Sequence, residues 1–131
     1  MKLSITSFDA VAQSEAGSKL DLLNPDNSET GLTVMVLGDN SDAVQKHSAT
    51  IIRQVRAADA LARKAGKEPE FDLEKIKEQN IEGAALRITG WEGVDEAFEK
   101  EVLKAALRRN PHWVNQIIEH SNNLANFTKK A

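Results

Sequence analysis

The 131-residue sequence has no cysteine, which excludes disulfide bonds and thiolate metal sites. It has no tyrosine, and its two tryptophans and four phenylalanines are poor material for a surface that stacks on bases. No apolar run approaches the roughly 20 residues needed to cross a bilayer. The N-terminal segment contains the charged residues Asp9 and Glu15 where a secretion signal would have an apolar core. We therefore expect neither a membrane span nor secretion.

The sequence also lacks the excess of positive charge that marks a nucleic-acid-binding protein, since its formal net charge is −3. The charges alternate along the chain: segments 1–40 and 67–100 are net acidic, and segments 41–66 and 101–131 are net basic. Such alternation suits elements or subunits that dock on each other, although solvated faces of ordinary sign variation are the simpler explanation. We expect no nucleic-acid partner.

An apolar run followed by a long helical pattern is the most prominent feature that is present. The run Leu32–Leu37 predicts a strand, and its apolar character predicts cover on both faces, by a helix and by another strand, arm or subunit. Residues 39–41 offer helix N-caps, and the helical pattern continues to Gly66. A helix over 42–65 would be about 36 Å long.

Apolar residues recur at helical spacing along this helix and predict the face that packs on the core. The stripe consists of Val44, Ser48, Ile51, Val55, Ala58 and Ala62, widened by Ala49 and Ile52. Four residues off the stripe form a candidate basic face for an acidic partner: Arg53, Arg56, Arg63 and Lys64. We expect the helix to be the spine of the core, with this basic face free.

The strand at 32–37 has a candidate partner just before it. Lys19–Leu23 alternates apolar and polar residues, and the intervening segment 24–31 is rich in turn-forming Asn, Asp, Pro and Gly. Antiparallel pairing is the simplest connection, and a two-stranded hairpin needs a helix beneath it to be stable. For residues 1–17 we expect a short strand or turn.

The second half of the chain predicts shorter helices. They cover 72 to about 88, then 95 or 99 to 109, and 111 onward, separated by a linker at 67–71 and a loop at 90–94. The pair Asn110-Pro111 is a typical helix start. We predict one α+β domain over 1–131, mostly α. An N-terminal arm and β-hairpin (1–38) pack on a helical body (39–128) of about four helices, followed by a frayed tail (129–131).

No residue pattern is typical of an active site or a metal site. His47, His112 and His120 lack metal-ligand spacing, and the segment 39–42 is followed by apolar residues where a calcium loop needs a ligand and a glycine. Neither a Gly-x-Ser-x-Gly elbow nor a phosphate-binding glycine loop occurs. The acidic run 68–74 suits a linker and a helix start better than paired catalytic carboxylates. We predict no enzymatic activity, no metal and no cofactor.

Some apolar residues are candidates for contact with a partner or a second copy. They are Leu32, Val34, Val36, Trp91, Trp113, Ile117, Leu124 and Phe127. Trp91 lies between two glycines, where it is either a core plug or an exposed anchor, and Trp113 has the same alternatives. The two-sided apolar strand and the apolar side of the last helix lead us to expect a homo-oligomer.

Several segments also follow one another in a characteristic order. They are the hairpin Lys19–Pro25 with Thr30-Gly31, the strand end Leu37–Ser41, the long basic helix, the acidic linker, Thr89–Glu92, the Phe98 helix, Asn110–Trp113 and Asn122–Lys129. Together they resemble the tail assembly chaperones of long-tailed bacteriophages. The resemblance covers nearly the whole chain, and its motifs are short and structural in kind.

The resemblance implies a small, largely helical, non-enzymatic protein that self-associates and coats the phage tape measure protein. Such chaperones keep apolar helical segments of the tape measure in solution until tail tube protein polymerises around it. They act in the host cell cytoplasm and are absent from the mature virion. The family also suggests a longer form made by ribosomal frameshifting near the C-terminus. The alternative is a structural tail or head-completion protein that is retained in the virion.

Overall fold

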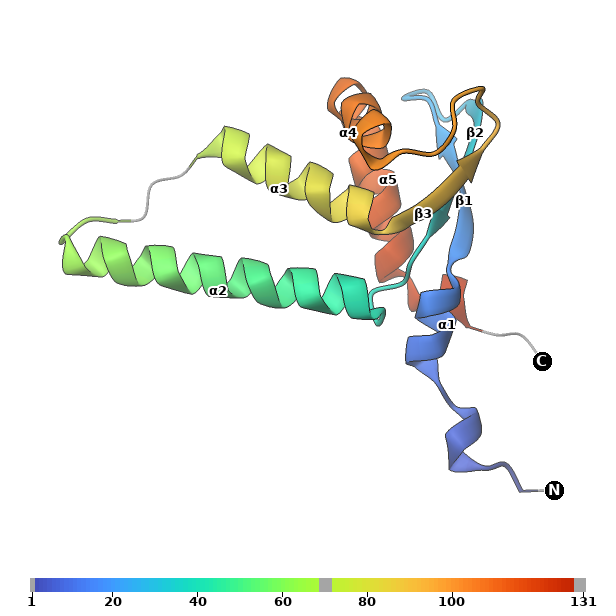
Figure 1. The fold of residues 1–131 in the computed structure, drawn as a ribbon, viewed down its shortest axis with the longest axis horizontal. Helices are drawn as coiled ribbons and strands as arrows, with labels where there is room; N and C mark the ends of the chain where they lie inside the picture. Colours follow the sequence, from blue (N-terminus) through green and yellow to red (C-terminus); the bar gives the residue numbers. More distant parts are fainter. Residues whose placement is uncertain (1, 69–71, 129–131) are drawn as a thin grey trace.

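The computed structural model describes residues 2–68 and 72–128. Along these residues the elements are η1 (Ile5–Ser7), α1 (Ala10–Ala16), β1 (Ser18–Leu23), β2 (Glu29–Val36), α2 (Asp42–Lys64), α3 (Leu73–Leu86), β3 (Ile88–Glu92), α4 (Lys100–Arg109), α5 (Pro111–Asn122) and η2 (Leu124–Phe127). An antiparallel sheet combined with a majority of helix confirms the predicted α+β, mostly α, class (Figure 1). The expected frayed tail 129–131 and the linker residues 69–71 lie outside the described residues.

The predicted hairpin is present, and β2 is the central strand of its sheet. β1 pairs antiparallel with β2, and Leu20 lies opposite Val34. The side chains of β2 alternate: Val34 and Val36 are buried against the helices, whereas Met35 is only half-buried. Helices thus cover the inner face as predicted, whereas cover of the outer face by an arm or a subunit stays a prediction.

A third strand replaces the predicted loop at 90–94. Helix α3 ends at Leu86, and β3 pairs antiparallel with β2, so that Trp91 lies opposite Val34. Gly93 follows with φ of 97°, and a Cβ at this position would overlap the carbonyl oxygen of Gly31. Glycine thus permits both the left-handed backbone and the close approach of the two strands. The region 39–128 is accordingly not purely helical.

The described residues 2–17 contain a 3₁₀ turn and a short helix, and no strand. The 3₁₀ turn η1 precedes helix α1, whose N-cap Asp9 accepts a hydrogen bond from the Ala12 N–H at 2.9 Å. Gly17 has φ of 81° and directs the chain from α1 into β1.

The core lies between the inner face of the sheet and helices α3, α4 and α5. Its buried residues are Leu22, Leu32, Val34, Val36, Ile81, Ala84, Ala85, Ile88, Leu103, Leu107, Val114 and Ile117. The last helix is shorter than predicted, because α5 ends at Asn122 and η2 continues the chain. Within η2, Leu124 is exposed and Phe127 is buried.

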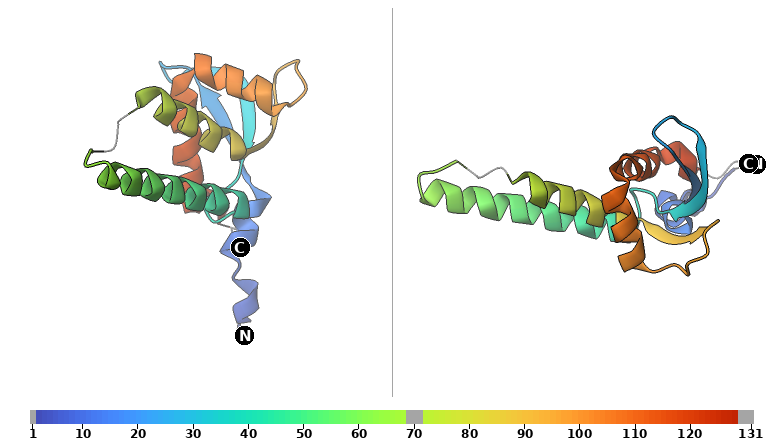
Figure 2. Two further views of the ribbon diagram at one scale, coloured as in Figure 1. Left: turned by 60° about the vertical axis from the view of Figure 1, so that its left-hand side comes forward. Right: turned by 90° about the horizontal axis from the view of Figure 1, so that it is seen from above.

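Helix α2 extends away from this core (Figures 1 and 2). Val44, in its first turn, is its only buried residue. The prediction that the apolar stripe of α2 forms the spine of the core is therefore wrong. The reason is that α3, α4 and α5 already cover the inner face of the sheet. Beyond its first turns, α2 therefore packs along α3.

Candidate binding surface of the projecting helical hairpin

Helices α2 and α3 run antiparallel and project together from the body as a helical hairpin (Figures 1 and 2). A hollow of about 320 Å³, the hairpin groove, lies between them near the body. Its lining residues are His47, Ser48, Ile51, Ile52, Gln79, Asn80, Gly83, Arg87 and Ile118. Helix α2 has 23 residues and helix α3 has 14, so the outer part of α2 extends beyond α3 and has little cover.

The hairpin exposes large apolar side chains that an isolated monomer ordinarily buries. Ile52, Val55 and Leu61 on α2 and Leu73 on α3 are each between 51 and 69% exposed. Ile51 is half-buried at the groove. Exposed apolar clusters next to a groove are typical of protein–protein contact sites.

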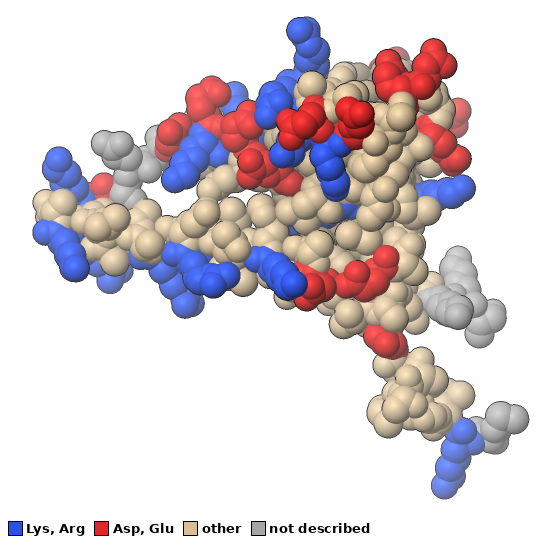
Figure 3. All heavy atoms as spheres, in the orientation of Figure 1, with Lys and Arg blue, Asp and Glu red and all other residues tan. Residues whose placement is uncertain are grey.

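The basic face predicted on α2 is exposed. Arg53, Arg56, Arg63 and Lys64 are all solvent-accessible, and Figure 3 shows basic side chains along the outer edge and the tip of the hairpin. Among the ion pairs formed by described residues, none involves these four side chains. Their charge is therefore available to an acidic partner.

On the neighbouring helix α3, an acidic side chain is neutralised by α4. Glu78 accepts two hydrogen bonds from Arg108, at 3.1 and 3.2 Å. The hydrogen bond from Arg108 lowers the pKa of Glu78, so this carboxylate stays ionised at neutral pH. The hairpin thus presents a basic helix, α2, beside a helix of nearly balanced charge, since α3 carries three glutamates and two lysines.

A buried polar cluster fixes the base of the hairpin. The Arg87 guanidinium donates to Ser121 Oγ at 3.0 Å and to the Gly83 carbonyl at 2.7 Å, and its Nη2 lies 3.6 Å from Asp39 Oδ1. Burial lowers the pKa of Arg87, while the Asp39 carboxylate opposes this effect. The Leu37 N–H donates to the Arg87 carbonyl at 2.7 Å. These bonds tie both ends of the hairpin to α5.

The start of α2 is capped from another element. Ser41 occupies the N-cap position, but its side chain makes no capping hydrogen bond. Instead, the Asp42 N–H donates to Glu15 Oε1 of α1 at 2.6 Å. The expectation that side chains of residues 39–41 cap this helix is wrong, and the acceptor from α1 is a contact that no local pattern could indicate.

Most of the predicted partner residues belong to the core of the chain itself. Leu32, Val34, Val36, Ile117 and Phe127 are buried within this chain, so the prediction that they face a partner is wrong. Their side chains are buried by contacts within the chain. Leu124 is the member of the predicted set that is exposed.

Both tryptophans are half-buried and hydrogen-bonded within the chain. Trp91 Nε1 donates to the Glu96 carbonyl at 2.9 Å, and the Trp91 ring meets Phe98 edge-on at 5.2 Å. Trp113 Nε1 donates to the Leu23 carbonyl at 3.1 Å. These contacts favour the core-plug alternative for both residues over the exposed anchor.

Sequence reasoning missed the exposed residues of the hairpin because it assigned the stripe of α2 to the core. One signal was available: the stripe contains Ser48 and small alanines, and it is longer than any helix predicted to pack on it. A long, weakly apolar stripe indicates a helix whose far end has no partner.

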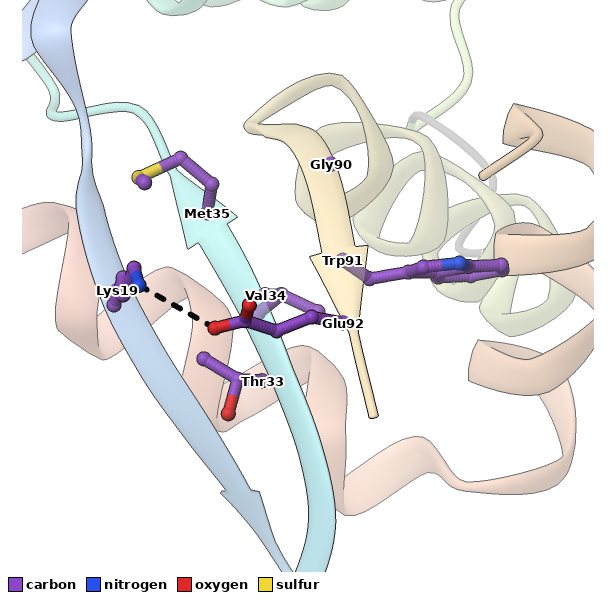
Figure 4. A pocket seen from close by; sticks show the side chains of 7 residues that line it. All are labelled: Lys19, Thr33, Val34, Met35, Gly90, Trp91 and Glu92. Atoms are coloured by element: carbon purple, nitrogen blue, oxygen red, sulfur yellow. Dashed lines mark ion pairs between the residues drawn. The ribbon is translucent and has the colours of Figure 1, made fainter. Parts of the chain in front are cut away.

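The outer face of the sheet carries a second, shallow hollow of about 210 Å³ (Figure 4). Lys19 and Glu92 reach across β2 and form an ion pair at 3.4 Å. Both side chains are largely exposed, so the pair contributes little to stability. Thr33 and Met35 lie between them, and the arrangement contains no group activated for catalysis.

Metal-ligand clusters and membrane-spanning helices are both absent from the part of the chain that the structure describes. Within residues 2–68 and 72–128, no three His, Asp or Glu side chains come together as metal ligands. Over the same residues, no helix combines the length and the apolar character that a bilayer crossing requires.

Comparison of the chain with protein-family models, curated proteins and solved structures finds no match.

Proposed function

We propose that this protein is a non-enzymatic tail assembly chaperone that binds apolar helical segments of a phage tape measure protein through the α2–α3 hairpin. The observation that carries this proposal is the exposure of Ile52, which lines the hairpin groove, and of Val55 one turn farther out. The ordered segments that resemble phage tail assembly chaperones give the partner its identity.

The hairpin groove suits an amphipathic helix. Ile51 and Ile52 offer apolar contacts in one turn and Val55 in the next, which is the spacing that a helix in a groove uses. The basic face beside them attracts acidic residues on the polar side of the bound helix. Binding of this kind needs no catalytic group and no cofactor.

The proposed setting is the host cell cytoplasm during tail morphogenesis. There the chaperone, as a homo-oligomer, would coat the tape measure protein until tail tube protein replaces it. It would then leave, and would be absent from the mature virion.

Co-expression with the tape measure protein from the same genome tests the proposal. We expect the wild-type chain to keep the tape measure protein in the soluble fraction and to co-purify with it. The double variant Ile52→Asp, Val55→Asp should lose both effects, because two charges would enter the apolar contact. The matched control Val94→Asp, Val102→Asp adds the same charges at two exposed apolar residues outside the hairpin and should behave like the wild type.

The proposal would be contradicted if no oligomeric form of the wild-type chain bound the tape measure protein. Mass spectrometry of purified virions addresses the alternative of a structural tail or head-completion protein. Absence from the particle supports the chaperone, whereas stoichiometric retention supports the structural role.

A further inference from the structure

The N-terminal arm, residues 3–11, is an exposed apolar segment. Leu3, Ile5, Phe8 and Val11 are each between 52 and 82% exposed. Residues 3–8 contain no charged side chain. Four large apolar side chains within nine residues are more than a monomeric surface ordinarily leaves in water.

The arm is firmly held at its base and free beyond it. Ser14 is buried, and its carbonyl accepts a hydrogen bond from the Gly38 N–H at 3.1 Å. Glu15 accepts the bond from the Asp42 N–H described above. Residues 2–12, in contrast, are all exposed. The body therefore presents the arm without covering it.

The arm and the hairpin of one molecule leave the body in different directions. In the views of Figures 1 and 2, the N-terminus and the tip of α2 lie at separate extremities of the molecule. The arm therefore points away from the hairpin groove of its own chain in this structure.

The hairpin groove offers apolar contacts to the arm. Ile51, Ile52 and Ile118 line it, Val55 adjoins it one turn farther out, and Arg87 of the lining is already paired with Asp39. Arg56 follows Ile52 by one turn and lies on the rim. The acidic residue of the arm, Asp9, comes directly after the uncharged run.

We propose that the N-terminal arm of one copy docks in the hairpin groove of a second copy. Leu3, Ile5 and Phe8 supply the apolar contacts, and Asp9 meets the basic rim of α2. The second copy is the occupant because each chain carries one unfilled groove and one uncovered arm that points away from it, and because the acidic Asp9 of the arm complements the basic Arg56 of α2.

Such a contact joins two different surfaces and is therefore heterologous. Each bound copy still offers a free arm at one end and a free groove at the other, so assembly continues head to tail instead of closing as a two-fold dimer. The interface does not depend on the tape measure protein. If the proposed function holds, a client helix and the arm compete for the same groove.

The first test is the mass of the full-length chain, measured by light scattering without any client. We expect the wild-type mass to rise steadily with concentration. The variants Ile5→Asp, Phe8→Asp (arm) and Ile52→Asp, Val55→Asp (groove) should each weaken association by about 100-fold or more, because two apolar contacts are lost. The control Val94→Asp, Val102→Asp places the same charges at two exposed apolar residues outside the arm and the hairpin, and it should assemble like the wild type.

Mixing the two defective variants is the decisive measurement. The arm variant retains a functional groove and the groove variant retains a functional arm, so an equal mixture should form complexes of two chains and stop there. A mixture that stays monomeric overturns the proposal. A wild-type chain that remains monomeric, or whose mass stops at two chains, also overturns it.

Cross-linking gives a readout that does not depend on aspartate variants. Because the chain has no cysteine, Ile5→Cys and Val55→Cys introduce single thiols without background. Mixed and mildly oxidised, they should form a disulfide-linked pair several-fold faster than Ile5→Cys with Ala60→Cys. Equal rates overturn the proposal. A wild-type chain that stays monomeric but still binds the tape measure protein would refute this inference alone and leave the proposed function standing.

Discussion

The Arg87 side chain links several elements at the base of the hairpin. Its guanidinium bonds to α3 and α5, and Asp39 provides the nearby negative charge. Ser121 completes the cluster, since its hydroxyl lies 2.8 Å from the Leu37 carbonyl and 3.0 Å from Asp39 Oδ1. A buried cation with this much hydrogen bonding becomes costly when its counter-charge is removed.

We predict that Asp39→Ala lowers the free energy of unfolding by about 2 kcal/mol, because it leaves Arg87 without its counter-charge and Ser121 with fewer partners. Urea unfolding followed by tryptophan fluorescence measures the change. Asp95→Ala, an exposed loop substitution, is the control and should stay within about 0.5 kcal/mol of the wild type. Equal effects of the two substitutions would show that the cluster is not stabilising.

His120 gives the fold a dependence on pH. Its Nε2 lies 3.1 Å from Ser18 Oγ, and the Asn126 amide donates to its Nδ1 at 3.2 Å, which requires an unprotonated ring nitrogen. Burial lowers the pKa of His120 below its ordinary value of 6.5. The unfolded chain therefore takes up a proton at a higher pH than the folded chain does.

Because protonation of His120 favours the unfolded chain, we predict that the free energy of unfolding falls as the pH drops below about 6.5. Above this pH the contribution of His120 is fully present. The melting temperature of the wild type should drop more between pH 7.5 and 5.5 than that of His120→Gln. The other histidines are common to both proteins, so the difference isolates His120. Parallel pH profiles for the two proteins would contradict the prediction.

At the scale of elements, the closure of β3 on β2 depends on a glycine. We predict that Gly93→Ala destabilises the chain by about 1–3 kcal/mol, because alanine is strained at φ of 97° and its Cβ would meet the Gly31 carbonyl. Gly90→Ala in the same strand has open space around it and should change stability by no more than about 1 kcal/mol. Thermal unfolding of both variants checks this contrast, and equal losses would refute it.

The elements that could be predicted are those with strong local signals. The unbroken stripe of α2 placed this helix at 42–65, and the structure has it at Asp42–Lys64. The hairpin β1–β2 followed from alternation and turn residues. Strand β3 could not be found in this way, because five residues interrupted by Gly90 form a strand only when β2, more than 50 residues earlier, supplies their partner.

The candidate site was predictable in part for the same reason. The exposure of Arg53, Arg56, Arg63 and Lys64 followed from helical spacing alone. Which apolar face is buried did not, because periodicity reports that a face is apolar and not what packs against it. Val55 and Ile117 have similar local patterns, yet Ile117 meets the sheet and Val55 meets solvent.

At the scale of the whole molecule, stability should be uneven. We predict that amide hydrogens in the outer turns of α2 exchange with solvent much faster than those of α5, because α2 has one buried residue and α5 has three. Hydrogen–deuterium exchange at low protein concentration, followed by mass spectrometry, measures both helices at once. Equal protection would contradict the description of α2 as a projecting helix.

The same experiment repeated at high concentration bears on assembly. If copies dock arm to groove, exchange in α2 near Ile52 should slow as the concentration rises, while exchange in α5 stays constant. The arm variant Ile5→Asp, Phe8→Asp should show no such concentration dependence.

The hydrogen bond from Leu37 to the Arg87 carbonyl marks the points at which the chain leaves and re-enters the body. The segment between these two residues joins two neighbouring strands, and only the inner end of α3 within it packs in the core. Lengthening or shortening the outer turns of both helices by whole turns would leave the register of the sheet unchanged. The reach of the hairpin can thus change by insertions and deletions while the body stays constant in size.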